Sequence, residues 1–200
     1  MVINLPMVNE AFIRSFIAIN IPAWLKDKLV QAQNRLKEVP GEISWTRKEG
    51  LHLTLKFLGN ITAEQIKAIT EGIRTATRGI PPFPLRFTGL GTFPHITRPR
   101  VVWIGLDDST GNLKNLQYNL EDRLEKLGFE REGREFSPHL TLGRVKLLRN
   151  KAPLIKIIEA HKQEEDWVFQ AEKVSLMKSE LRPTGAIYSV LEEVVLVAGP

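Results

Sequence analysis

The chain has 200 residues, of which 42% are hydrophobic and 26% charged, and its formal net charge is +5 at pH 7. This composition can build a sizeable core and excludes disordered and fibrous classes. The lack of cysteine excludes disulfides, thiolate zinc sites and cysteine nucleophiles, and it suits a reducing compartment, so a cytoplasmic location is expected. Charged residues interrupt every apolar stretch before it reaches the roughly 18 residues of a membrane span. The positive charge favours an anionic partner such as RNA or a nucleotide.

The first half of the chain predicts an alternation of strands and helices. Residues 1–12 carry no clear pattern and are predicted to be an N-terminal extension of a single domain at residues 13–200. An apolar run at 15–21 is typical of a strand, and an amphipathic helix follows Pro22. A second strand is predicted at 51–58. A helix with Thr62 as its N-cap and a β-rich stretch at 83–93 come next.

The second half repeats this order. A strand is predicted at 101–106, a helix with leucines at spacings of three and four ends at Gly128, and another strand lies at 138–145. A helix after Pro153, a β-rich stretch at 167–181 and a final strand at 188–197 complete the chain. The repeat predicts an α+β fold of two β-α-β-α-β lobes, at approximately 13–99 and 100–197. Largely antiparallel sheets, related by a pseudo-twofold axis, would line a central cleft.

The tetrapeptide His-Leu-Thr-Leu occurs in the second strand of each half, at 52–55 and at 139–142. Because alternate residues of a strand point to opposite faces, His52, Thr54 and Lys56 are expected on one face. Leu51, Leu53, Leu55 and Phe57 would then lie on the other face, toward the core. In the second copy, His139 and Thr141 project together in the same way.

Two such pairs across one cleft provide what hydrolysis of a phosphodiester requires. One neutral imidazole can take a proton from water while the other, protonated, gives one to the departing oxygen. The threonine hydroxyls can donate hydrogen bonds to the phosphoryl oxygens. This scheme needs no metal and no cofactor. A single His-x-Thr is more often an ordinary surface feature, but packing alone gives no reason to keep His and Thr at the same place in both halves.

Further stretches accompany the two tetrapeptides: Arg14 to Ala18, Glu49 to Leu51, Lys56 to Gly59, Gly89 to Pro94, Arg98 to Val101, Phe136 to His139, and Arg144. Together they make the chain similar, over nearly its whole length, to the two-histidine phosphoesterase superfamily. Within it, the chain resembles the RNA 2',3'-cyclic phosphodiesterases, formerly called 2'-5' RNA ligases. Gly50 departs from the family, which usually has Asn directly before the Leu of the first motif, but this puts no catalytic residue in doubt.

The resemblance implies that water opens a ribose 2',3'-cyclic phosphate to give a 2'-phosphate and a free 3'-hydroxyl. His52 would protonate the departing 3' oxygen, and His139 would activate the water. The residues alone leave these two roles interchangeable, because both histidines have the same neighbours in their strands. Thr54 and Thr141 would hold the phosphoryl oxygens.

Arg144 faces the phosphate in the family pattern, and a guanidinium offers permanently charged donors there. Strict alternation instead places it on the leucine face, so a phosphate-facing Arg144 requires a twist or a bulge, which Gly143 would permit. Phe57 occupies the matching place after the first motif and is predicted either to contact substrate or to lie in the core. Lys56 and His95 are further candidate substrate contacts, and His95 is alternatively a solvated loop residue.

Four other side chains have a chemistry that could serve the site. Trp45, Trp103 and Tyr188 are predicted either to stack on bases or to belong to the core. His161 ends a helix and is most simply a favourable cation there.

Two functions compete with hydrolysis of the cyclic phosphate. The same site could join tRNA halves reversibly through a 2'-5' bond, by microscopic reversibility. The chain could also be an RNA-end binding module that keeps the site without turnover, although two intact histidines argue against this. Its expected partners are RNA ends or small nucleotides that carry a cyclic phosphate, and a monomer without an obligate protein partner is predicted.

Overall fold

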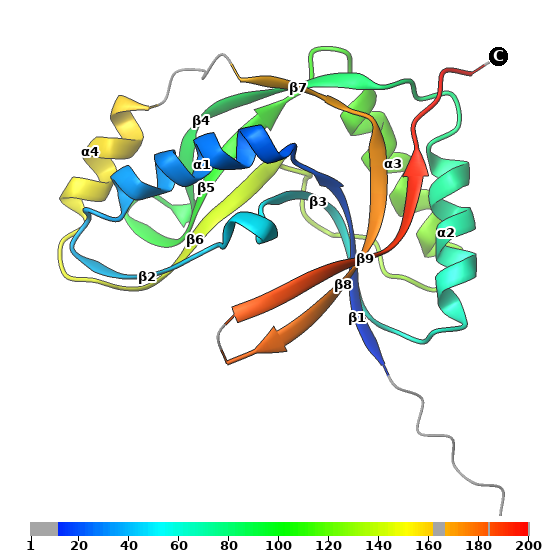
Figure 1. Ribbon diagram of the computed structural model, residues 1–200, viewed down its shortest axis with the longest axis horizontal. Helices are drawn as coiled ribbons and strands as arrows, with labels where there is room; N and C mark the ends of the chain where they lie inside the picture. The colour runs from blue at the N-terminus through cyan, green and yellow to red at the C-terminus, as the bar shows by residue number, and fades with distance from the viewer. Residues whose placement is uncertain (1–11, 162–166, 184, 200) are drawn as a thin grey trace, which may run out of the picture.

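The computed structural model describes residues 12–161, 167–183 and 185–199, and its strands form two sheets with helices packed against them (Figure 1). Residues 1–11 of the predicted N-terminal extension lie outside this described part. In chain order the elements are β1 (Ile13–Asn20), α1 (Ala23–Leu36), β2 (Gly41–Trp45), the short 3-10 helix η1 (Lys48–Gly50), β3 (His52–Ile61), α2 (Gln65–Ala76), β4 (Phe83–His95), β5 (Arg98–Asp107), α3 (Asn112–Glu125), β6 (His139–Leu148), α4 (Ala152–Ala160), β7 (Val168–Ala171), β8 (Lys173–Arg182) and β9 (Gly185–Val195).

Both sheets are antiparallel, which confirms the predicted α+β class. One has four strands in the order β3-β1-β8-β9, and the other has five in the order β2-β6-β5-β4-β7. The internal repeat is visible in this order, because β3-β1-β8 of the first sheet corresponds to β6-β5-β4 of the second. The two His-Leu-Thr-Leu strands, β3 and β6, hold equivalent places.

The sheets do not follow the expected lobes at 13–99 and 100–197, because the halves exchange strands. β4 belongs to the first half but lies in the five-stranded sheet, and β8 and β9 belong to the second half but lie in the four-stranded sheet. The physical reason is local: β4 and β5 are joined by a tight turn and pair directly, His95 with Arg98. Strands joined by a short turn usually pair with each other, so β4 pairs with β5 rather than with the first-half strands β1 and β3.

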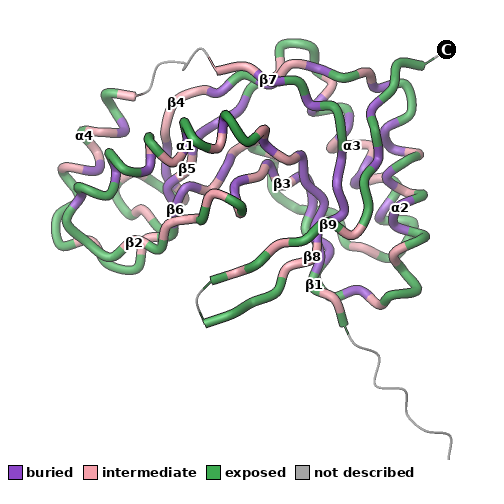
Figure 2. The backbone as a smooth tube through the Cα atoms, in the orientation of Figure 1, coloured by how far each residue is buried: buried purple, intermediate pink, exposed green. Residues whose placement is uncertain are grey.

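The helices are exchanged in the same sense. α2 and α3 pack together on the four-stranded sheet, whereas α1 and α4 pack on the five-stranded one (Figure 1). The apolar positions Leu25 and Leu29 of α1 and Leu116 and Leu120 of α3 are buried, as their spacing predicted. Buried segments follow the strands and the inner faces of the helices (Figure 2). Within the described residues, no helix has both the length and the apolar character that crossing a membrane requires.

Two details of the strands differ from the sequence prediction. The stretch at 167–181 is not one strand but two, β7 and β8, which belong to different sheets. β2 was not predicted, because it is only five residues long and its two apolar residues, Ile43 and Trp45, are too few to establish an alternation. β2 is the edge strand beside β6, so it flanks the second motif.

Candidate active site

The two motif strands lie in contact with each other, although they belong to different sheets. On β3, His52 pairs with Asn20 of β1, and on β6, His139 pairs with Gly105 of β5. The leucines of both tetrapeptides are buried, while the histidines and threonines are only partly buried. The alternation predicted for the tetrapeptides themselves is therefore present.

Both strands contain a β-bulge at the last leucine of the motif. Thr54 pairs with Ala18 and Lys56 with Ile17, so Leu55 has no partner on β1. In the same way Thr141 pairs with Trp103 and Gly143 with Val102, which leaves Leu142 without a partner on β5. An extra residue in one strand reverses the alternation beyond it. Lys56 and Gly143 consequently turn to the buried side, and Phe57 and Arg144 turn outward.

This bulge overturns two assignments made for the first motif. Lys56 was expected beside His52 and Thr54 as a candidate substrate contact, but the residue is only 5% exposed. Its Nζ lies 2.6 Å from Glu121 Oε2 and 2.7 Å from the carbonyl oxygen of Glu130, so Lys56 belongs to a buried ion pair. Phe57 was placed on the leucine face, yet it is 67% exposed, which excludes the core interpretation.

From the sequence, an outward-facing Arg144 required a twist or a bulge near Gly143, and the second bulge provides it. The side chain is exposed rather than buried, so it lies on the same face of β6 as His139 and Thr141, and its charge contributes to lowering the pKa of His139. The residue before it must be glycine: a Cβ at Gly143 would lie 2.8 Å from Ile43 Cγ2 and 2.8 Å from Trp45 Cε3. Trp45 therefore packs over Gly143 and against the core, as its core interpretation required.

His52 is surrounded by aromatic rings. Phe16 stacks on the imidazole with ring centroids 4.6 Å apart, and Tyr188 meets it edge-on at 5.1 Å. Burial is the main cause that lowers the pKa of His52 to about 4, and the nearby Lys26 cation adds to the effect. A hydrogen bond with the backbone of Gly50 opposes it. His52 is therefore neutral at pH 7 in the free protein.

His139 has a similar but more open environment. Phe93 meets the imidazole edge-on at 4.9 Å, and Trp103 is tilted toward it at 6.2 Å. Nδ1 lies 2.7 Å from the carbonyl oxygen of Ser137. A carbonyl oxygen can only accept, so Nδ1 carries the proton and the neutral ring leaves Nε2 free to accept one. Burial lowers the pKa of His139, the Ser137 hydrogen bond raises it, and Arg144 lowers it.

Each imidazole thus has a carbonyl partner two residues earlier in the chain and one neighbouring cation. The carbonyls belong to Gly50 and Ser137, and the cations are Lys26 for His52 and Arg144 for His139. Lys26 lies in the first turn of α1, where its Nζ also donates to the carbonyl oxygen of Glu49 at 3.3 Å. A cation beside an imidazole disfavours its protonation and attracts an anionic ligand.

Sequence reasoning missed Lys26, and it could not decide the environment of Tyr188. A lysine in the first turn of a helix is an ordinary solvated residue by pattern, and only the packing of α1 beside η1 brings it to His52. For Tyr188 and Trp103 the structure places the rings against the two histidines. His95, by contrast, is an exposed residue at the end of β4, and no contact joins it to either motif histidine among the described residues.

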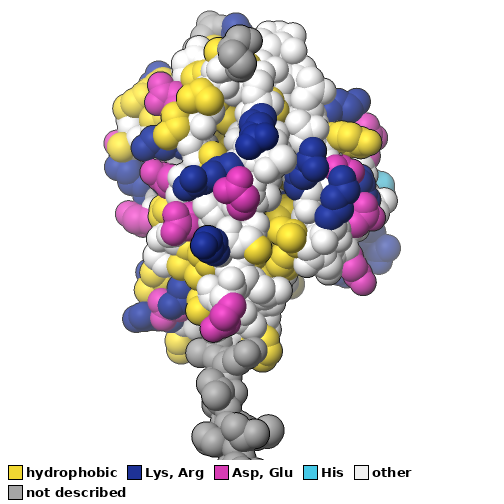
Figure 3. Space-filling view, turned by 90° about the vertical axis from the view of Figure 1, so that its right-hand side faces the viewer, with side chains coloured by type: hydrophobic (Ala, Val, Ile, Leu, Met, Phe, Trp, Pro, Cys, Tyr) yellow, Lys and Arg dark blue, Asp and Glu magenta, His cyan; other side chains and the backbone are white. Residues whose placement is uncertain are grey.

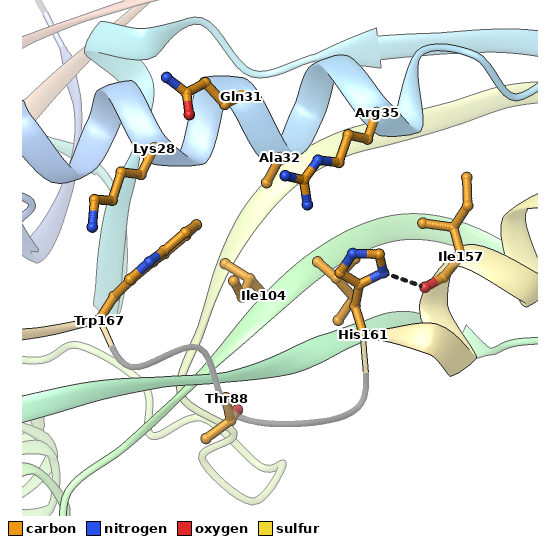
Figure 4. Close-up of a pocket in the computed structure, with 10 residues that line it drawn as sticks. Lys28, Gln31, Ala32, Arg35, Thr88, Ile104, Ile157, His161 and Trp167 are labelled. Carbon is orange, nitrogen blue, oxygen red and sulfur yellow. Dashed lines mark hydrogen bonds between the residues drawn. The ribbon is translucent and has the colours of Figure 1, made fainter.

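A separate pocket lies between α1, α4 and the five-stranded sheet (Figure 4). It is lined by Lys28, Arg35, Ile104, His161 and Trp167 among others, and it contains neither motif histidine. His161 ends α4 as predicted, and its Nδ1 lies 2.8 Å from the carbonyl oxygen of Ile157. On the face of α2 and α3, cationic and anionic side chains are interspersed (Figure 3), so the positive net charge is not gathered there.

Comparison with known proteins agrees with this geometry. The family model described as the 2'-5' RNA ligase superfamily matches residues 26–183. The chain belongs to this superfamily. An RNA 2',3'-cyclic phosphodiesterase from Methanocaldococcus jannaschii is 38% identical over 180 residues, which is 90% of this chain and 99% of that protein. One from Methanothermobacter thermautotrophicus is 35% identical over 180 residues, 90% of this chain and 97% of that protein.

Two solved structures have a similar fold. TT0787 of Thermus thermophilus superposes with a TM-score of 0.78 and 27% identity over 92% of this chain and 98% of that one. E. coli LigT complexed with 3'-AMP gives a TM-score of 0.74 and 25% identity over 93% of this chain and 99% of that one. The resemblance inferred from the motif residues is thereby confirmed.

Proposed function

We propose that the chain hydrolyses the 2',3'-cyclic phosphate of RNA ends or small nucleotides to a 2'-phosphate without a metal ion. The observation that carries this proposal is the matched environment of the two imidazoles. His52 and His139 each have a carbonyl partner, a neighbouring cation and a threonine two residues further along a strand, and the two strands are in contact. Two such imidazoles supply both proton transfers of the reaction.

In this reaction the oxygen of a water molecule attacks phosphorus while the bond from phosphorus to the 3' oxygen breaks. His139 accepts the proton of the water on Nε2. This nitrogen is unprotonated in the neutral ring, because Nδ1 carries the proton and donates it in a hydrogen bond to the Ser137 carbonyl oxygen. His52 donates a proton to the departing 3' oxygen. Thr54 and Thr141 donate hydrogen bonds to the non-bridging oxygens, where negative charge increases in the transition state. Arg144 binds one of these oxygens as a permanent cation.

The acid role of His52 requires a proton that the free protein does not keep at pH 7. The substrate supplies the missing condition, because its phosphate carries a negative charge. An anion beside the imidazoles raises their pKa, against burial, which is the main cause that lowers it, and against the smaller effect of Lys26 and Arg144. Substrate binding and protonation of His52 are therefore coupled, and His52 takes up a proton from solvent when the anionic substrate binds.

Relatives support the choice of substrate. The proteins that are 35% and 38% identical are named RNA 2',3'-cyclic phosphodiesterases, and the E. coli LigT structure holds 3'-AMP. A nucleotide with a phosphate on its ribose has the same recognition elements as a cyclic phosphate end. The net charge of +5 favours either ligand over long range.

The test is incubation with an oligonucleotide that ends in a 2',3'-cyclic phosphate, in the presence of EDTA. We expect complete conversion to the 2'-phosphate, identified by chromatography against 2'- and 3'-phosphate standards. An oligonucleotide with a 3'-phosphate is the control and should not change. A 3'-phosphate product would contradict the assigned leaving group, loss of activity in EDTA would contradict the metal-free mechanism, and no turnover at any protein concentration would leave only the RNA-end binding function.

The name of the superfamily makes joining of RNA ends the second function to test. In that reaction a 5'-hydroxyl takes the place of water and attacks the cyclic phosphate, so that a 2'-5' bond forms. Incubation of tRNA halves with a 2',3'-cyclic phosphate and a 5'-hydroxyl end decides between the two. We expect hydrolysis to exceed joining, because water is present at a far higher concentration than the second RNA end.

A further inference from the structure

The bulge at Leu142 is stabilised by a buried side chain from another part of the chain. Gln33, near the end of α1, is only 2% exposed, and its Nε2 donates to the carbonyl oxygens of Leu142 at 2.8 Å and of Thr46 at 2.9 Å. The Leu142 carbonyl also accepts from the backbone N–H of Thr46 at 2.9 Å. One amide group thus fastens the bulged residue of β6 to the end of β2.

Apolar packing alone does not require an amide at this place. Both hydrogens of its NH2 group are used on backbone carbonyls, and burying an amide is unfavourable unless its hydrogen bonds are made. A leucine of similar size would fill the same space without this requirement. The side chain is therefore explained by the backbone it holds, and that backbone carries Thr141 on one side of the bulge and Arg144 on the other.

The first motif has a buried polar group at the corresponding place. Glu121 of α3 accepts from Lys56, the residue directly after the bulged Leu55, and from the backbone N–H of Glu132 at 3.3 Å. In both halves a helix thus sends one buried polar side chain to the motif strand of the other half. The polar groups differ, an amide at one bulge and a carboxylate at the other. Their presence at both bulges indicates that each bulge is stabilised by a buried polar side chain.

We propose that Gln33 is a positioning residue for Arg144, which rests on the function proposed above. Its amide holds the bulge at Leu142, and the bulge turns Arg144 from the core side to the exposed face that carries His139 and Thr141. Without the amide, the β6 carbonyl loses a buried partner and the strand can return to regular alternation, which directs residue 144 away from the site. Gln33 acts through Arg144 and does not contact the substrate.

A double-mutant cycle tests this assignment. The variants are Gln33→Leu, Arg144→Ala and the two combined, assayed for kcat and KM on the cyclic phosphate oligonucleotide. Arg144→Ala should lower kcat/KM by about 10²-fold, the effect of removing one donor to a developing oxyanion. Gln33→Leu should lower it by about tenfold in the wild-type chain but by less than about twofold when Arg144 is already absent.

The matched control is Thr70→Val on α2. Thr70 is also a buried polar residue, 6% exposed, and its Oγ1 donates at 2.8 Å to the carbonyl oxygen of Ile66, within its own helix. This variant should lose similar stability but keep its kcat/KM within about twofold. Circular dichroism and thermal melting verify the folding of each variant. Gln33→Met, which keeps the length of the side chain, serves as a second variant if Gln33→Leu does not fold.

A readout without turnover separates this proposal from the proposed function. The side-chain Nε–H signal of Arg144 in a ¹⁵N spectrum is assigned by its disappearance in Arg144→Ala. It should shift or broaden in Gln33→Leu and stay in place in Thr70→Val, whether or not the cyclic phosphate is hydrolysed. An unchanged Arg144 signal in Gln33→Leu would overturn the positioning role, and so would effects of Gln33→Leu and Arg144→Ala that multiply in the cycle.

Discussion

The surroundings of His52 and His139 have the same backbone features, but the side chains that follow the two motifs differ. In both, a buried leucine pair anchors the strand, a bulge follows the threonine, and a carbonyl two residues earlier holds the imidazole. The position after the bulge is Lys56 in one strand and Gly143 in the other, and the next is exposed Phe57 against exposed Arg144. The backbone geometry of the motif is thus duplicated more faithfully than its side chains.

This difference shows how the charge is distributed around the site. The second motif presents its cation, Arg144, on the same strand as the imidazole it affects. The first motif buries its own cation, Lys56, in an ion pair and receives Lys26 from α1 instead. Each imidazole therefore keeps one cationic neighbour, although the two cations come from unrelated places in the chain.

Replacement of the histidines should have the largest effect and shows whether the two environments have distinct roles. His52→Ala and His139→Ala should each lower kcat by about 10² to 10⁴-fold, which is the usual contribution of a positioned acid or base. Binding of an oligonucleotide that ends in a 2'-phosphate should largely persist, as measured by fluorescence anisotropy. Wild-type activity in either variant would refute the pairing of the two motifs.

Removing the buried cation of the first motif should mainly affect stability. In Lys56→Met the Glu121 carboxylate is left buried without its partner, and loss of one member of a buried pair costs about 3 to 5 kcal/mol. Urea unfolding measures this free energy. The double variant Lys56→Met with Glu121→Leu should recover much of it, because no charge remains buried. A cost below about 1 kcal/mol for Lys56→Met would show that the ion pair is not what holds this bulge.

The unequal burial of the two imidazoles should appear in the pH dependence of stability. The pKa of His52 is about 4 in the folded chain and about 6.5 when unfolded, so the unfolded state binds the proton first as pH falls. The stability from neutral His52 is complete above about pH 6.5 and is lost between pH 6.5 and 4, by at most about 3 kcal/mol.

The comparison is made with two matched variants. The unfolding free energy of His52→Gln should fall less steeply over this pH range than that of the wild type. His139→Gln should reduce the slope by less, because His139 is the more exposed of the two imidazoles. Parallel pH curves for the wild type and His52→Gln would contradict the buried neutral imidazole.

Replacement of Phe57 should have the smallest effect. It tests whether this ring binds substrate at the position where the second motif has Arg144. The ring is exposed and near Phe16, at 6.2 Å between centroids, so Phe57→Ala should change the unfolding free energy by less than about 0.5 kcal/mol. If the ring stacks on a base, KM for the oligonucleotide should rise about fivefold with kcat unchanged. An unchanged KM would leave the residue without a part in binding.

The sequence predicted the alternation within each tetrapeptide because His, Leu, Thr and Leu follow the strand period. It failed at Lys56, because a bulge depends on a partner strand and on buried groups such as Glu121 that are distant in the chain. At Arg144 the structure shows an exposed side chain, which the family pattern requires and strict alternation did not predict, whereas its contact with the phosphate stays a prediction. Lys26 and Gln33 could not be recognised, since only the packing of α1 brings them to the motifs: beside η1 for Lys26 and against β6 of the five-stranded sheet for Gln33.

The exchange of β4, β8, α1 and α3 between the halves has a consequence for how the chain can be divided. If it were cut in the turn between β4 and β5, the first fragment would keep β1 and β3 without β8, and the second would keep β5 and β6 without β4. Each fragment would lack the neighbour of a central strand and one of the two helices that pack on its sheet, α3 in the first fragment and α1 in the second. We expect neither to fold alone, whereas the two mixed together should complement each other, so the smallest folding unit of this duplicated protein includes both copies.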